Sequence, residues 1–145
     1  MADATAATPD RTIPIPDRDS APYWSALAQG RLEVQQCRDC GRWSWPARPV
    51  CSKCQSENLV WREVQGSGEV YSWVVAHRPF APRLADEVPY TIALVRLDED
   101  EGVLIPAALL PGDGVHQGMR VRAVAHPLTD EVGELTWEPA APDHT

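Results

Sequence analysis

Four cysteines, the only ones in this 145-residue chain, form two Cys-x-x-Cys pairs. Cys37 and Cys40 make the first pair, Cys51 and Cys54 the second, and ten residues separate the pairs. Zinc binds thiolate sulfur at about 2.3 Å, and a two-residue spacer lets one tight turn direct both sulfur atoms of a pair to one ion. Two pairs complete a tetrahedron and leave no position for water or substrate. The spacing therefore predicts a zinc ribbon whose metal is structural and performs no chemistry.

Other uses of four cysteines are a pair of disulfides or a redox-active Cys-x-x-Cys. Between Met1 and Arg11 the residues are Ala, Asp, Thr and Pro without an apolar core, so we expect no secretory signal and a cytoplasmic protein, in which disulfides are uncommon. A redox pair stands between a strand and a helix, whereas polar or aromatic stretches follow both pairs here. Iron in a rubredoxin-like site takes the same ligands, so zinc is favoured and iron stays open.

The balance of charge bears on the class of partner. The formal net charge is −8, and four thiolates around a divalent ion would make it about −10. A protein that binds nucleic acid needs a basic surface to neutralise phosphates, so this charge predicts no nucleic-acid partner. Because no apolar run approaches the length that crosses a bilayer, we also expect no membrane association.

The order of composition along the chain predicts four parts. Prolines and small polar residues indicate a flexible tail over residues 1–19. Residues 20–65 are expected to form a short capped helix and the zinc ribbon. Residues 66–138 are expected to form a second module, and residues 139–145 a second flexible tail. The fold class is therefore mainly β, with one short helix near the N-terminus.

Turn and capping residues delimit the first module. Asp19 or Ser20 is expected to cap the helix, with Pro22 in its first turn and Gly30 at its end. Two strands should flank the cysteines, at residues 31–36 and 59–64. Between the pairs, aromatic residues and prolines predict a stiff finger that packs the ribbon and leaves indole surface for a partner.

The second module reads as short strands separated by turn residues. They are expected at residues 69–76, 90–97, 103–110, 119–124 and 134–138. Five short strands without long helices between them favour a closed OB-fold barrel. The side chains expected inside it are Val70, Val74, Ile92, Leu94, Val103, Ile105, Met119, Val121 and Ala123. Trp73, expected on one face with Tyr71 and Val75, is assigned to the core.

The order of these parts resembles a family of small zinc-ribbon and OB-fold proteins that accompany thiolase-like enzymes and acyl-CoA hydratases. The residues that carry the resemblance include Pro22-Tyr-Trp24, the two cysteine pairs, Gly66-x-Gly-x-Val-Tyr-Ser-Trp73 and Val88-Pro-Tyr90. It implies a non-catalytic accessory subunit of a hetero-oligomer that binds a thiolase-like or hydratase-like enzyme and helps to form its acyl-CoA channel. Members serve thiolase or acyltransferase reactions, or the retro-aldol cleavage that removes steroid side chains.

Exposed aromatic, proline and arginine residues are the candidates for that interface. They are Trp45, Pro46, Arg48, Pro49, His77, Arg78, Phe80, Arg83 and Tyr90. Arg78 and Arg83 are candidates for contact with a coenzyme A phosphate.

No catalytic constellation accompanies these residues. The four histidines, His77, His116, His126 and His144, are scattered, and no serine or cysteine motif of a hydrolase is present. We therefore expect no activity of the chain on its own. The alternative function is a free-standing zinc-ribbon and OB-fold module that binds nucleic acid or an acidic ligand, and an independent hydrolase or transferase ranks last.

Overall fold

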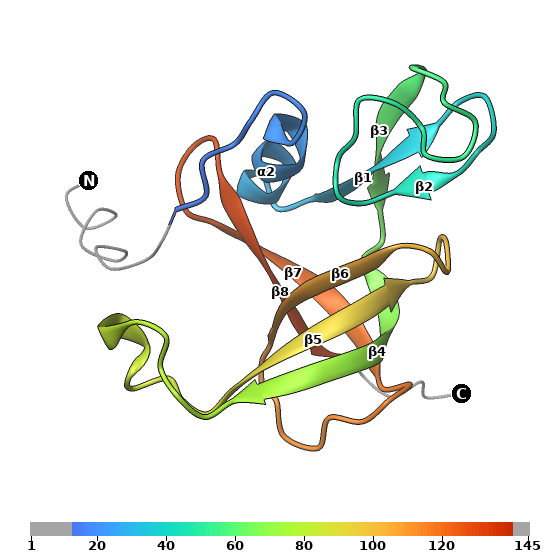
Figure 1. Cartoon of the computed structure of the whole chain (residues 1–145). Coiled ribbons are helices and arrows are strands. Elements are labelled where there is room, and N and C mark those ends of the chain that lie inside the picture. The colour runs from blue at the N-terminus through green and yellow to red at the C-terminus, as the bar shows by residue number, and fades with distance from the viewer. Residues whose placement is uncertain (1–12, 141–145) are drawn as a thin grey trace.

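The computed structural model describes residues 13–140, which form one short helix, a three-stranded sheet and a five-stranded barrel (Figure 1). In chain order the elements are α2 (Ala21–Ala28), β1 (Leu32–Cys37), β2 (Trp43–Ser44), β3 (Leu59–Val64), β4 (Ser67–Ala76), the 3-10 helix η1 (Pro82–Leu84), β5 (Tyr90–Leu97), β6 (Leu104–Leu109), β7 (Arg120–Pro127) and β8 (Gly133–Pro139). Most of the two predicted tails lies outside these residues. No helix within them is long and apolar enough to cross a membrane.

Helix α2 begins and ends at short-range signals. Ser20 occupies the N-cap position, but its hydroxyl accepts a hydrogen bond from the backbone N–H of Asp17 instead of capping the helix. At the other end Gly30 has a φ of +83°. The N–H of Gly30 donates to Leu27 O, and the N–H of Arg31 donates to Ala26 O, which is the Schellman motif. The predicted cap residue is therefore in place without its predicted bond, and the predicted glycine stop is confirmed.

The barrel closes in the order β4-β5-β6-β8-β7. Most neighbours are antiparallel, whereas β6 and β8 pair in parallel over only two residue pairs. Strands β4 and β7 close the barrel over three residue pairs. The predicted OB-fold barrel is thus confirmed, and β3 and β5 have the predicted bounds.

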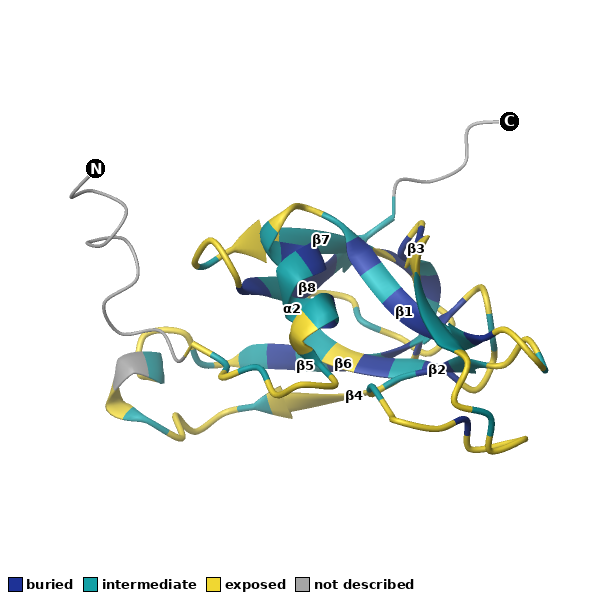
Figure 2. Cartoon of the chain, turned by 90° about the horizontal axis from the view of Figure 1, so that it is seen from above, coloured by how far each residue is buried: buried dark blue, intermediate teal, exposed yellow. Residues whose placement is uncertain are grey.

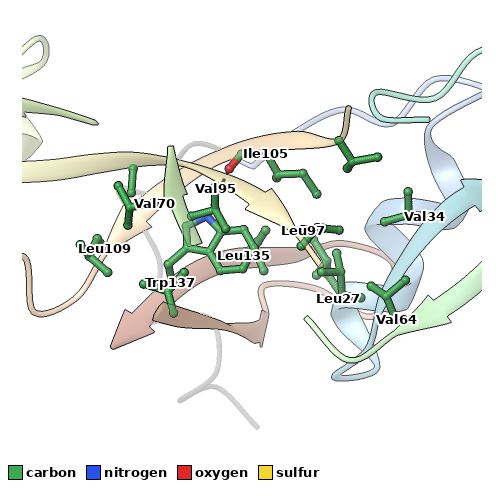
Figure 3. Packing of buried hydrophobic residues seen from close by; sticks show 14 of the residues in the cluster. Leu27, Val34, Val64, Val70, Val95, Leu97, Ile105, Leu109, Leu135 and Trp137 are labelled. Atoms are coloured by element: carbon green, nitrogen blue, oxygen red, sulfur yellow. Dashed lines mark hydrogen bonds between the residues drawn. The ribbon is translucent and has the colours of Figure 1, made fainter. Parts of the chain in front are cut away.

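The core is continuous between the ribbon and the barrel. Trp137 on β8 is fully buried, and its Nε1 donates a hydrogen bond to Ile105 O at 3.3 Å (Figure 3). Leu27 of α2 and Val34 of β1 belong to the same buried cluster. Helix α2 therefore packs on the barrel, although it precedes the ribbon in the chain.

The prediction of inward-facing side chains was correct for only some strands. Four of the predicted residues, Val70, Val103, Ile105 and Val121, are buried. On β5 the buried row is instead Thr91, Ala93, Val95 and Leu97, so Ile92 and Leu94 lie on the outer face. Val74, opposite Ile92, is 63% exposed. Met119 and Ala123 are only partly buried against the core.

A β-bulge explains why Val74 of β4 faces outward. Val70 pairs with Val95 and Ser72 pairs with Leu94, so Tyr71 is an extra residue without a partner on β5. Side chains alternate strictly along a regular strand, and one extra residue reverses which positions face the core. Trp73 pairs with Ala93 of the buried row, but it is 37% exposed because no described strand pairs with β4 on its other side at this position, so its assignment to the core was wrong. From Tyr71 to Val75 the strand is exposed, as Figure 2 shows.

Candidate metal centre and interaction surfaces

The two Cys-x-x-Cys segments form matching turns. The N–H of Gly41 donates to Cys37 O, and the N–H of Gln55 donates to Cys51 O, both at 2.9 Å. The residue after each second cysteine has positive φ, +80° at Gly41 and 64° at Gln55. This conformation costs a glycine little, whereas a residue with a side chain pays about 1 kcal/mol or more. The repeated geometry brings two pairs of sulfur atoms to one point.

The sulfur atoms fit one tetrahedral ion. The Sγ atoms of Cys37, Cys40, Cys51 and Cys54 all lie within 4.8 Å of one another. Cys37 Sγ is 3.6 Å from Cys54 Sγ, and Cys40 Sγ is 3.6 Å from Cys51 Sγ. A tetrahedron with metal–sulfur bonds of about 2.3 Å has edges of about 3.8 Å. A disulfide requires about 2.05 Å, so these contacts describe a metal site and all four cysteines are free.

Hydrogen bonds in the two turns favour the thiolate form of the first cysteine of each pair, Cys37 and Cys51. The backbone N–H of Cys40 lowers the pKa of Cys37. Backbone N–H groups of Cys54 and Lys53 lower the pKa of Cys51 to about 6. The backbone N–H of Ser56 acts in the same direction on Cys54, but burial and the three neighbouring thiols raise its pKa to about 12. A divalent cation would relieve this competition for protons, because it binds all four as thiolates.

Side chains that the spacing did not reveal hold the turns together. Asp39, inside the first Cys-x-x-Cys, accepts hydrogen bonds from the hydroxyl of Ser56 and from Nδ2 of Asn58. These bonds lower the pKa of the Asp39 carboxyl. The backbone N–H of Arg38 also donates to Asn58 O at 2.8 Å. The first cysteine turn is thus fixed to the segment after the second.

One acidic side chain links the ribbon to the barrel. Asp100 lies in the turn between β5 and β6, where its Oδ1 accepts a hydrogen bond from the N–H of Gly102 at 2.7 Å. Its Oδ2 accepts a longer one from the N–H of Trp43 on β2. The sequence suggested only a polar turn here, because a contact across 57 positions leaves no local pattern.

The predicted interface residues of the ribbon lie around the finger after β2. The ring of Trp45 meets that of Tyr23 edge-on, with centroids 5.9 Å apart, and is half-buried. Pro46, Arg48 and Pro49 are exposed. The backbone N–H of Arg48 donates to the side chain of Gln35 and its C=O accepts a bond from that same amide, so the finger is held in one conformation.

The remaining predicted residues lie at the other end of the molecule. His77, Arg78 and Phe80 follow β4 and are exposed, and Phe80 is 84% exposed. Tyr90 at the start of β5 is half-buried, and Arg83 lies in η1. Figures 1 and 2 both place this loop far from the cysteine turns, so the predicted interface consists of two separate groups. Strand β4 runs between them.

Comparisons with known proteins cover most of the described chain. Residues 24–60 match the rubredoxin-like zinc ribbon domain of ChsH2, and residues 61–126 match its C-terminal OB-fold domain. The chain is 34% identical over 128 residues to a 3-oxo-4,17-pregnadiene-20-carboxyl-CoA hydratase alpha subunit of Mycobacterium tuberculosis. Those residues are 87% of this chain but 39% of that protein, and the chain spans well under half of the hydratase alpha subunits that it matches.

Two further relatives are closer in size. A DUF35 domain-containing scaffold protein of Pyrococcus furiosus is 29% identical over 118 residues, which are 79% of this chain and 85% of that one. A solved chain of the Ltp2-ChsH2(DUF35) aldolase superposes with a TM-score of 0.75 at 35% identity, over 88% of this chain and 99% of that chain. With its four-sulfur site and closed barrel, the chain belongs to the ChsH2 family of zinc-ribbon and OB-fold (DUF35) proteins.

Proposed function

We propose that the chain is a non-catalytic accessory subunit that binds a thiolase-like or hydratase-like enzyme subunit and completes its acyl-CoA site. The observation that carries the proposal is the match over nearly the full length of the ChsH2(DUF35) chain of an aldolase. A relative of similar size is described as a scaffold protein. The hydratase alpha subunits among the relatives are named for coenzyme A thioesters, which favours an acyl-CoA as the ligand of the complex.

Two of the described histidines have hydrogen-bond partners close by in the structure. His126 Nε2 lies 2.8 Å from Thr136 Oγ1, and His116 Nδ1 lies 3.0 Å from Gly114 O. The Sγ atoms of all four cysteines lie close enough together to bind one ion, and we propose that they form one closed site.

We propose zinc as the ion in that site. Four thiolates in tetrahedral arrangement suit zinc, and the closed ligand set gives it a structural role. Iron would accept the same sulfur atoms, so elemental analysis of the freshly purified protein separates the two metals. One zinc ion per chain is the expected result.

The partner is proposed to lie along the molecule, because the two groups of interface residues stand at opposite ends. The finger at Trp45 and the loop with Arg78 and Phe80 would contact one enzyme subunit, and Arg78 would lie near the coenzyme A phosphates. Retro-aldol cleavage of a steroid side-chain thioester is the reaction that the aldolase relative favours for the complex.

The test uses the Ltp2 subunit of the solved aldolase relative as the probe. We expect the purified chain to form a stable complex with Ltp2 in size-exclusion chromatography, and to raise its aldolase activity from a low basal value. The chain alone should not turn over an acyl-CoA. Turnover by the chain alone, or an Ltp2 that is neither bound nor activated, would contradict the proposal. Salt-dependent binding of single-stranded oligonucleotides would instead support the nucleic-acid alternative.

A further inference from the structure

Strand β4 has an open edge beyond the point where the barrel closes. Its pairing with β7 covers only Ser67, Gly68 and Glu69. Val70 adds two backbone hydrogen bonds, from its N–H to Met119 O at 2.9 Å and from the N–H of Gly118 to its C=O at 2.8 Å. From Tyr71 to Ala76, no described residue pairs with β4 on the side opposite β5. This open stretch is about 20 Å long.

The backbone groups that point out of this edge can be assigned. Because Val70 directs its N–H and C=O toward β7, the next pair with β5, Ser72 with Leu94, is the hydrogen-bonded one. Alternation then turns Ser72, Val74 and Ala76 toward β5. Trp73 and Val75 direct their N–H and C=O groups outward, away from the barrel.

The side chains along the edge are uncharged and largely apolar. Val74 is 63% exposed, Tyr71 43%, Val75 40% and Trp73 37%. The guanidinium of Arg96 lies over the Tyr71 ring, 4.7 Å from its centroid, and holds that side chain at the start of the stretch. Trp73 and Val75 lie on one face and Val74 on the other, so an added strand would meet apolar side chains on both faces.

Other open edges of the described strands carry features that prevent pairing. On β6, Pro106 opposes Leu94 and has no N–H to offer the side away from β5. On the outer edge of β3, Arg62 and Glu63 are charged and exposed. Natural proteins protect edges with prolines and charges, and an unprotected apolar edge is a template for another chain. Strand β4 has neither device from Tyr71 to Ala76.

We propose that this edge accepts an extended, uncharged apolar segment of the enzyme subunit as an additional strand. This inference rests on the accessory-subunit function proposed above. The edge lies between the two groups of interface residues and leads directly into His77, Arg78 and Phe80, so the added strand continues that surface. The recognition is β-augmentation, in which backbone bonds supply affinity and alternate side chains supply specificity.

Two other occupants fit the edge less well. A second copy carries the same net charge of −8, which opposes association of two chains. The segment of this chain before Ile13 contains Asp3, Asp10, Arg11 and a proline, and offers no run of apolar residues.

The test compares two substitutions at one position, with Ltp2 as the probe. Val75→Pro removes an outward N–H and places a ring in the path of an added strand, while the bonds of Val74 and Ala76 to β5 stay. Val75→Thr keeps the shape and the N–H. We expect Val75→Pro to weaken the complex at least tenfold and Val75→Thr to bind within about threefold of the unchanged chain, both with circular dichroism like that of the unchanged chain.

A measurement on the unchanged chain keeps the test independent of how well the proline variant folds. In amide hydrogen exchange, Trp73 and Val75 should exchange at least tenfold more slowly in the complex than in the free chain. Val74, already bonded to β5, should change little and serves as the internal control.

Each outcome decides the inference. If the unchanged chain binds Ltp2 but Trp73 and Val75 keep the exchange of the free chain, the edge is not the docking site and the accessory function stands. If the unchanged chain does not bind, both proposals fail. If it self-associates in analytical ultracentrifugation and Val75→Pro makes it monomeric, a second copy is the occupant and the proposed partner is wrong.

Discussion

Replacing Gly133 by alanine should detach helix α2 from the barrel. Gly133 begins β8, directly beneath the C-terminal turn of the helix. A Cβ atom at this position would lie 2.2 Å from the carbonyl carbon of Leu27 and 2.3 Å from the nitrogen of Ala28. Ordinary contacts begin near 3.4 Å, so the helix would have to move by more than 1 Å. No side-chain rotation relieves a contact with helix backbone.

The magnitude follows from two opposing effects. Alanine in place of glycine within a strand normally gains about 0.5–1 kcal/mol. Overpacking of a core normally costs about 1–3 kcal/mol, and a rigid helix backbone places this site at the upper end. We therefore expect a net loss of about 2 kcal/mol in the free energy of unfolding. For a chain of this size that lowers the melting temperature by roughly 4–8 °C.

Thermal unfolding followed by circular dichroism measures the change, and tryptophan fluorescence reports the release of Trp24 and Trp45. The matched control is Gly102→Ala, whose Cβ would meet two side-chain atoms, a carboxylate oxygen of Asp100 at 3.2 Å and Nη2 of Arg42 at 3.7 Å. It should stay within about 0.5 kcal/mol of the unchanged chain. A Gly133→Ala chain that melts at or above the original temperature would refute the reasoning, because the gain in strand propensity would then exceed the clash.

Three further changes have defined outcomes. Cys51→Ser should lose the bound metal by elemental analysis, and a chelator should then lower the melting temperature of the unchanged chain but not of the variant; a fresh preparation without zinc or iron would contradict the metal site. Burial raises the pKa of Tyr23 to about 12 from 10.0, so the neutral phenol is favoured in the folded state. The stability that the neutral Tyr23 phenol contributes is complete below pH 10, and the free energy of unfolding falls by up to about 3 kcal/mol as the pH rises to 12. Tyr23→Phe should remove that part of the pH dependence in urea unfolding. Gln55→Gly should stabilise the second cysteine turn by about 0.5–1 kcal/mol, whereas Gln36→Gly within β1 should cost a similar amount; equal signs in chemical denaturation would show that the positive φ stores no strain.

Local chemistry explains which parts of the structure the sequence predicted. The four metal ligands depend on spacing within two short turns, and the end of α2 depends on one glycine, so both could be predicted. Strands β3 and β5 were correct in extent, because turn residues bound each of them. Ser20 was placed correctly, but its hydroxyl bonds Asp17, since a serine can satisfy either neighbouring group.

Features that depend on contacts between distant segments could not be predicted. The bulge at Tyr71 leaves no mark in the residue types, so strict alternation from Val70 wrongly placed Val74 inward. Trp73 is exposed because the pairing of β4 with β7 ends at Glu69, which the sequence of β4 does not reveal. The two predicted interface groups proved to lie at opposite ends, because loop positions are set by the barrel and not by the composition of the loops. The linkage of Asp100 to Trp43 and the contact of Gly133 with Leu27 are of the same kind.

The docking of α2 on β8 has a consequence for the order in which the chain acquires its structure. Leu27 and Gly133 are 106 positions apart, and the last strand leaves the ribosome long after the helix. The cysteine turns close over short loops and can bind their ion while synthesis continues, but the part of the packing surface of α2 that β8 supplies is absent until that strand is complete. During that interval the side of α2 at Leu27 and Ala28 that meets Gly133 is exposed. We therefore expect nascent chains stalled before residue 133 to hold the metal and remain sensitive to protease around α2, and completion of β8 to protect that segment.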